Sequence, residues 1–148
     1  MVELLMSLLP GLRLSTFQMT SPPTPVYNCI AWAAGQTLKW WWPTTDVLDD
    51  AHIWPDGVPN EVTLPAFTAA FATLNYFVCE NDAHEGGWEK VAIFVDERQT
   101  PTHAARQLAN GRWTSKLGKA EDIEHDLHAL EGDVYGKVAM LLKRPIQA

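Results

Sequence analysis

The residues with the clearest chemical potential are one cysteine and one histidine. Cys29 follows Asn28 directly, and His103 lies in the Pro-Thr-His-Ala-Ala segment of residues 101–105. If Asn28 caps a helix, Cys29 is its first residue, where partial positive charge and free backbone amides favour the thiolate. A histidine held on a strand beside such a helix can act as general base for the thiol. The pair predicts nucleophilic catalysis at a carbonyl and leaves the substrate open.

A third group must orient the imidazole of His103. Asn110 and Gly111 are the strongest short hairpin signal, and a tight turn there brings the residues just after the hairpin close to the far nitrogen of the ring. Asp122 is our candidate for this role. In the alternative reading, Glu121 and Asp122 stabilise the N-terminus of a following helix through its dipole.

Further side chains are candidates for holding the substrate or its oxyanion. The Cys29 backbone N–H and the Asn28 side chain are the nearest donors for an oxyanion. Tryptophans can line a substrate groove, although core packing and loop anchoring are alternative roles for them. A serine on the strand after the hairpin needs a bulge to face His103. These candidates for oxyanion or substrate binding are Asn28, Trp32, Trp42 and Ser115.

No metal site and no cofactor are predicted. Cys79 with His84, and His125 with His128, lack the paired spacing of a zinc site. We interpret His125 and His128 as part of a solvated helix face. No glycine-rich phosphate loop is present in the sequence.

Composition excludes several classes of partner. The 148 residues carry a formal net charge of −7, and no Lys/Arg cluster is present to neutralise a nucleic-acid backbone. No segment reaches the ~18 apolar residues of a membrane span. Two cysteines in an acidic domain of this size are typical of reduced thiols, so we expect a cytoplasmic protein whose partner is a peptide or amide substrate, or another protein. Residues 1–9 are apolar but contain Glu3 in place of a basic region, so we interpret them as mature protein.

Helices are predicted in the first half of a single domain, 1–148. Residues 1–24 form a lead-in that ends in a proline-rich extended stretch, and the core spans 25–145. A helix is expected over 29–39, followed by a long irregular loop to residue 60. A second helix is expected over 64–74, with Thr63 as its N-cap and Pro65 in its first turn.

The second half changes to a period of two. Strands are expected over 76–79, 90–95, 102–109 and 112–117, and a further strand over 135–143. A third helix is expected over 120–130. Helices that precede an antiparallel sheet indicate an α+β fold, with the N-terminal helices packed on a mostly antiparallel sheet of about four to five strands.

The motifs also resemble a known superfamily. A helix-start cysteine, then a strand histidine followed by Ala-Ala, then Gly-Arg-Trp-Thr-Ser-Lys-Leu-Gly at 111–118, is similar to the papain-like cysteine hydrolases, including the NlpC/P60 and CHAP-type amidases. The resemblance implies a papain-like fold, Cys29 as nucleophile and His103 as base, acting on a peptide, isopeptide or cell-wall amide. It does not identify the third residue: Thr114, Ser115 and Lys116 stand where papain has Asn-Ser-Trp, and papain's glutamine before the cysteine is missing.

A closer resemblance connects the chain to a bacterial domain family of unknown function, over roughly residues 25–145. It rests on the Asn-Cys-Ile-Ala-Trp-Ala motif at 28–33, the Trp-Trp-Trp-Pro run at 40–43, residues 101–108, the Trp-Thr-Ser-Lys-Leu-Gly motif at 113–118 and Asp-Ile-Glu-His at 122–125. The alternative to an enzyme is a catalytically inactive papain-like binding module, for example in a bacterial toxin, immunity or defence system. Its contact surface would be the tryptophan-rich loop.

Overall fold

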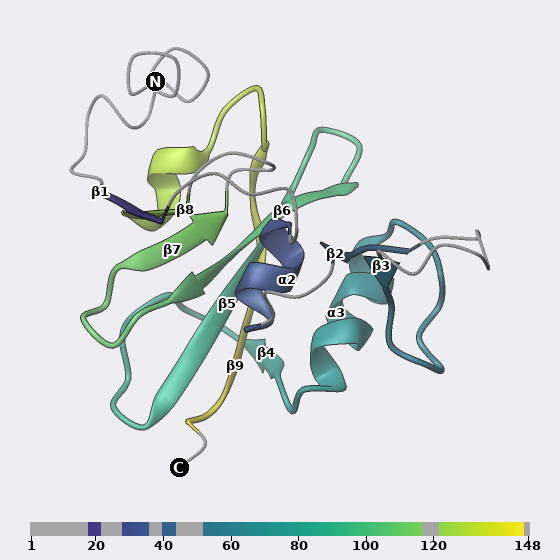
Figure 1. The fold of residues 1–148 in the computed structure, drawn as a ribbon, viewed down its shortest axis with the longest axis horizontal. Coiled ribbons are helices and arrows are strands. Elements are labelled where there is room, and N and C mark those ends of the chain that lie inside the picture. The colour runs from purple at the N-terminus through teal and green to yellow at the C-terminus, as the bar shows by residue number, and fades with distance from the viewer. Residues whose placement is uncertain (1–17, 22–27, 36–39, 44–51, 117–121, 147–148) are drawn as a thin grey trace.

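The computed structural model describes residues 18–21, 28–35, 40–43, 52–116 and 122–146. Its centre is a sheet of seven strands in which every neighbouring pair is antiparallel (Figure 1). The α+β class is confirmed, whereas the expected four to five strands were too few. In order across the sheet the strands are β1 (Gln18–Ser21), β8 (Asp122–His125), β7 (Trp113–Lys116), β6 (Pro101–Gln107), β5 (Trp88–Val95), β9 (Lys137–Pro145) and β4 (Phe77–Cys79).

The edge strand β1 comes from the segment that the sequence indicated to be a lead-in. It pairs with β8, with Gln18 opposite Glu124 and Met19 opposite Ile123. The core was expected to start at residue 25, but the sheet already begins with β1 at Gln18.

Helix α2 (Cys29–Ala33) is capped as predicted, because the Asn28 side chain accepts a hydrogen bond from the backbone of Ala31. The helix is shorter than the expected 29–39. It ends at its C-cap, Ala34, because Gly35 follows with a φ of +81°, a left-handed conformation that terminates helices. Residues 36–39 lie outside the described part of the chain.

Helix α3 (Leu64–Ala72) confirms the second predicted helix. The Thr63 side chain accepts a hydrogen bond from the backbone of Ala66, and Pro65 lies in the first turn. The buried face of the helix presents Phe67 and Phe71 at helical spacing. Between α2 and α3, the expected loop contains two short parallel strands, β2 (Trp40–Trp41) and β3 (His52–Ile53).

The third predicted helix, 120–130, is wrong. Residues Asp122–His125 are strand β8, and only Leu127–Leu130 form a short 3-10 helix, η2. Within β8, Ile123 and His125 are fully buried and Glu124 between them is half-buried, so the segment has the period of two of a strand. The sequence-based prediction missed this period because it counted His125 as a surface residue.

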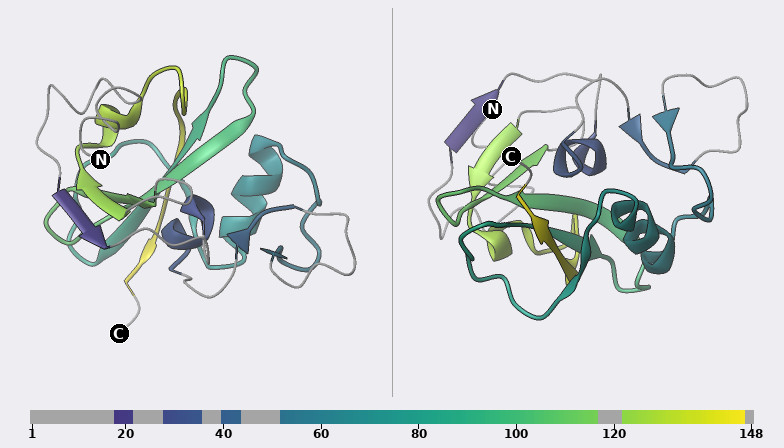
Figure 2. Two further views of the ribbon diagram at one scale, coloured as in Figure 1. Left: turned by 45° about the horizontal axis from the view of Figure 1, so that its top comes forward. Right: turned by 90° about the horizontal axis from the view of Figure 1, so that it is seen from below.

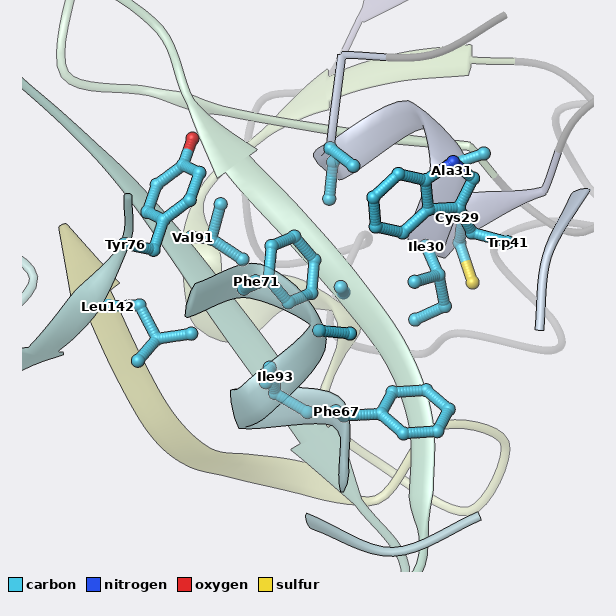
Figure 3. Close-up of a cluster of buried hydrophobic side chains, with 14 residues drawn as sticks. Cys29, Ile30, Ala31, Trp41, Phe67, Phe71, Tyr76, Val91, Ile93 and Leu142 are labelled. Atoms are coloured by element: carbon cyan, nitrogen blue, oxygen red, sulfur yellow. The ribbon is translucent and has the colours of Figure 1, made fainter. Parts of the chain in front are cut away.

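Each face of the sheet covers its own hydrophobic cluster. The first cluster joins α2 and α3 to side chains of β5, β6 and β9, as Figure 3 shows for Cys29, Ile30, Phe67 and Phe71. The second cluster lies beneath η2 and contains alternate residues of the same central strands. Figure 2 shows α2 and η2 on opposite sides of the sheet. The buried members of the second cluster are Ala92, Phe94, Ala105, Trp113, Ile123, Leu127, Ala129 and Leu130.

Candidate active site

Cys29 lies at the N-terminal end of α2, against β6. Its side chain is 7% exposed and packs in the first cluster with Ala104 of β6 and Ile93 of β5. Burial raises the pKa of the thiol to about 11, although backbone N–H groups of Ala104, Ile30 and Cys29 itself act in the opposite direction. The thiolate expected from the helix N-terminus is therefore not the resting form, because desolvation outweighs the amides.

Asn28 connects α2 to β2. Its Oδ1 accepts hydrogen bonds from the backbone N–H groups of Ala31 and Trp41, each at 3.0 Å, and its Nδ2 donates to the Trp41 carbonyl at 2.9 Å. The side chain is only 3% exposed. The structure therefore gives Asn28 a structural role as helix cap and strand partner, and its amide is not presented as an oxyanion donor.

His103 belongs to a buried chain of hydrogen bonds that crosses three strands. Its Nε2 lies 3.0 Å from Ser115 Oγ, and the same hydroxyl lies 2.7 Å from His125 Nε2. The other ring nitrogen of His125, Nδ1, lies 2.7 Å from the backbone carbonyl of Asp126. All three side chains have no exposed surface. The partner of the His103 far nitrogen is therefore Ser115.

Two aromatic rings fix the plane of the His103 imidazole. Tyr135 stacks on it at 4.1 Å between centroids, and Phe94 meets it edge to face at 5.1 Å. Burial, and then the neighbouring His125, lower the pKa of His103 well below its ordinary value, so the ring is neutral at pH 7. Within the described residues its Nδ1 has no hydrogen-bond partner.

Cys29 and His103 approach the same stretch of β6 from different sides. Ala104 faces Cys29 and α2, whereas the ring of His103 lies with Phe94 on the face covered by η2. Strands β6 and β7 pair through Arg106 with Thr114 and Gln107 with Trp113, further along β6 than His103. The side chains of Cys29 and His103 therefore lie on opposite faces of the sheet, and no hydrogen bond joins them in the described structure.

The other predicted site residues are spread over the sheet and its cover. Asp122 lies in β8 opposite Lys116. The place beside His103 Nε2 that we predicted for Asp122 is taken by Ser115. Trp32 Nε1 donates to Thr114 Oγ1 at 3.0 Å, which anchors α2 to β7. Trp42 packs edge to face on Phe67 at 5.3 Å, in the first hydrophobic cluster.

Sequence reasoning missed His125 and Tyr135. The alternation of Ile123, Glu124 and His125 was the available signal for His125, because it places the histidine on the inner face of a strand. No comparable signal exists for Tyr135, which lies between η2 and β9 and reaches His103 only through the tertiary fold.

Two other kinds of site are absent from the described part of the chain. Within it, no group of three or more His, Cys, Asp or Glu side chains is arranged to hold a metal ion. No helix among these residues has the length and apolar character needed to cross a membrane.

These features define an α+β domain in which a helix-start cysteine and a serine-linked pair of histidines meet a seven-stranded antiparallel sheet. The chain belongs to the family described as Domain of unknown function (DUF7689), whose model matches residues 18–143. That match extends across the sheet from β1 almost to the end of β9. No curated protein matches the chain, and no solved structure does.

Proposed function

We propose that this domain is a papain-like thiol hydrolase that uses Cys29 as nucleophile and His103 as base on a peptide, amide or isopeptide bond. The observation that carries the proposal is the position of Cys29 at the first residue of α2, where backbone N–H groups of Ala104, Ile30 and Cys29 itself act on its sulfur to favour the thiolate. Because the His103 ring lies on the opposite face of β6 with Phe94 and Ser115, the proposed reaction requires this part of β6 to rearrange when substrate binds.

The charge state of the pair determines how the reaction would begin. The pKa of Cys29 is raised and that of His103 is lowered, both mainly by burial, so the resting pair is a neutral thiol and a neutral imidazole. The proton then moves when the substrate carbonyl is in place: the S–H bond breaks, an N–H bond forms on His103, and the sulfur bonds to the carbonyl carbon.

The remaining steps follow from that transfer. His103 returns its proton to the leaving nitrogen as the C–N bond breaks, which leaves a thioester on Cys29. A water molecule activated by His103 then hydrolyses the thioester and restores the thiol. Lys116, which is fully buried, contributes positive charge near the sulfur and acts to lower the pKa of Cys29 slightly.

Acylation by an activated ester tests the proposal without knowledge of the natural substrate. Purified protein is mixed with p-nitrophenyl acetate, and the acetylated cysteine is located by mass spectrometry. We expect Cys29 to be acetylated faster than the more exposed Cys79, and His103→Gln to slow the reaction ~10²-fold or more. Cys79→Ser is the matched control and should react like the parent. Acetylation of Cys29 that is no faster than Cys79, and that is unchanged by His103→Gln, contradicts the enzyme.

Burial favours a second candidate function, a binding module without catalysis. Cys29 is nearly enclosed and His103 is fully enclosed, as expected of residues that only stabilise the fold. The partner would contact the tryptophan-rich segment, where Trp41, Trp54, Pro55 and Leu74 line a surface hollow of about 310 Å³. The acylation experiment separates the two functions, because a binding module needs no fast reaction at Cys29.

A further inference from the structure

Arg106 carries a positive charge that forms no ion pair with any of the described residues. It lies near the end of β6 and is half-buried. Its Nε is enclosed and has no hydrogen-bond partner there. Arg112 and Arg144, by contrast, form ion pairs with Asp126 and Glu89. In a chain with 18 acidic and 11 basic residues, an arginine that is left unpaired at this depth calls for an anion from outside, because buried charges are normally paired.

A second unsatisfied donor, the hydroxyl of Tyr76, belongs to the same face of the sheet. Tyr76 is 3% exposed, and its hydroxyl has no partner in the part of the chain that the structure describes. Figure 3 shows this hydroxyl directed away from Leu142. Burial raises its pKa to about 12, so it keeps its hydrogen at pH 7. Arg144 and Arg106 lower this pKa by smaller amounts and Glu89 raises it, which leaves one positive charge in excess around the ring.

Helix α2 holds the guanidinium of Arg106 in place. Its Cζ lies 5.6 Å from the centroid of the Trp32 ring, within the range of a cation–π contact. The indole is fixed in turn, because its Nε1 donates to Thr114 Oγ1 at 3.0 Å, and Thr114 is the residue of β7 that pairs with Arg106. Packing therefore orients the planar donors of Arg106 before any anion is bound.

Arg106 and Cys29 lie on the same face of the sheet. The backbone of Ala104 acts on the Cys29 sulfur, and Arg106 is the next residue of β6 to face the same side. Two positions along a strand correspond to ~7 Å. On α2, Trp32 follows Cys29 by three positions, which makes the two neighbours on the helix surface. A group bound at Arg106 is therefore about two strand positions from the place where Cys29 meets β6.

We propose that Arg106 and Tyr76 form a binding site for a carboxylate group of a peptide. A guanidinium presents paired N–H donors that match the two oxygens of a carboxylate, and the tyrosine hydroxyl supplies one more donor. The single charge of a carboxylate balances the one excess positive charge, whereas a phosphate dianion exceeds it. The site itself does not depend on catalysis. Where the proposed hydrolase holds, on which this last step rests, it defines the substrate as a peptide with a free carboxylate near the bond that is cleaved.

Two matched dipeptides test the site. The full chain, labelled with ¹⁵N, is titrated with N-acetyl-glycyl-glycine, which has a free carboxylate, and with N-acetyl-glycyl-glycinamide, which has none. The Nε–H signal of Arg106 is assigned by its loss in Arg106→Lys. We expect the acid to shift this signal saturably and to bind at least ~10-fold more tightly than the amide, because only the acid carries a charge. Equal affinities, or an acid that does not bind, overturn the proposal.

An arginine pair gives the matched control. Arg106→Gln removes the charge and should weaken binding of the acid ~10-fold or more, whereas Arg98→Gln, in the exposed turn between β5 and β6, should leave it unchanged. Arg106→Lys keeps the charge but loses the planar pair of donors, so it should also weaken binding and serves if Arg106→Gln does not fold. Tyr76→Phe removes one donor and should weaken binding about threefold. Equal binding by Arg106→Gln and Arg98→Gln excludes a site at Arg106.

The outcomes separate this site from the proposed hydrolase. Selective binding of the acid, together with a Cys29 that is inert to p-nitrophenyl acetate, contradicts the hydrolase and leaves the carboxylate site standing. Fast acetylation of Cys29 in a protein that does not prefer the acid to the amide supports the hydrolase and overturns the carboxylate site.

Discussion

The two faces of the sheet are stabilised by different physical means. On the face covered by α2 and α3, a large apolar cluster includes the cysteine like any small hydrophobic residue, and the buried polar side chains Asn28 and Thr114 bond to β2 and to Trp32. On the face covered by η2, an apolar cluster surrounds a serine and two histidines that satisfy one another. The first face loses stability mainly through cavities, and the second mainly through unsatisfied polar groups.

The largest effect is expected on the apolar face. Phe67 is fully buried and contacts the rings of Trp42 and Trp54 at 5.3 and 5.1 Å. Phe67→Ala should lower the free energy of unfolding by ~3–5 kcal/mol, because the ring leaves a cavity in the first cluster. Urea denaturation measures the loss. Phe77→Ala, at a position 48% exposed, is the control and should cost much less; equal costs would remove the distinction between core and surface.

The polar face should respond to loss of a single oxygen. Ser115→Ala leaves both His103 Nε2 and His125 Nε2 without their partner, which should cost ~1–3 kcal/mol in unfolding free energy. The double variant with His125→Phe should cost less than the sum of the single variants, because one of the two orphaned nitrogens is then gone. Additive losses in urea denaturation would show that the chain does not act as a unit.

Acid should destabilise the polar face specifically. The pKa of His125 is about 4 in the folded protein and near its ordinary value when unfolded, so the unfolded chain binds more protons between these values. The contribution of neutral His125 to stability is therefore complete above about pH 6.5 and is lost as the pH falls toward 4, with a slope of up to ~1.4 kcal/mol per pH unit. Urea midpoints measured from pH 4 to 7 should show a shallower slope in His125→Phe than in His128→Phe.

The smallest effect concerns the contact between α2 and the sheet. Trp32→Phe removes the indole N–H that Thr114 accepts and leaves a nearly buried hydroxyl, with an expected cost of ~0.5–1.5 kcal/mol. Trp54→Phe removes a similar bond to the Pro59 carbonyl at an exposed position and should be close to neutral. If Trp54→Phe costs as much in urea denaturation, burial does not determine the value of these bonds.

Local signals in the sequence predicted much of the fold. The caps Asn28 and Thr63 mark the starts of α2 and α3, and the apolar run in β5 identified a buried central strand. Caps and apolar runs depend on residues close together in the sequence, so the sequence alone predicts them. The end of α2 also had a local signal, Gly35, which our prediction did not use.

Which side chain lies beside His103 depends on the pairing register of β6 and β7, and the sequence determines that register less directly. A tight turn at Asn110 and Gly111 would put Ser115 on the opposite face from His103. In the structure Gln107 pairs with Trp113 and the loop between them is longer, so the register changes by one residue and Ser115 joins His103 on the same face. That shift explains why Asp122 was preferred as the orienting group.

The strand order has a consequence for how this chain reaches its native state. β1 is the first described strand in the sequence, yet its partner is β8, so pairing of Gln18 with Glu124 closes a loop of about 100 residues, a long-range contact of the kind that slows folding. Before β1 docks, the outer edge of β8 is open to other chains. Pairing of β1 with β8 therefore covers a sheet edge that would otherwise be open to self-association.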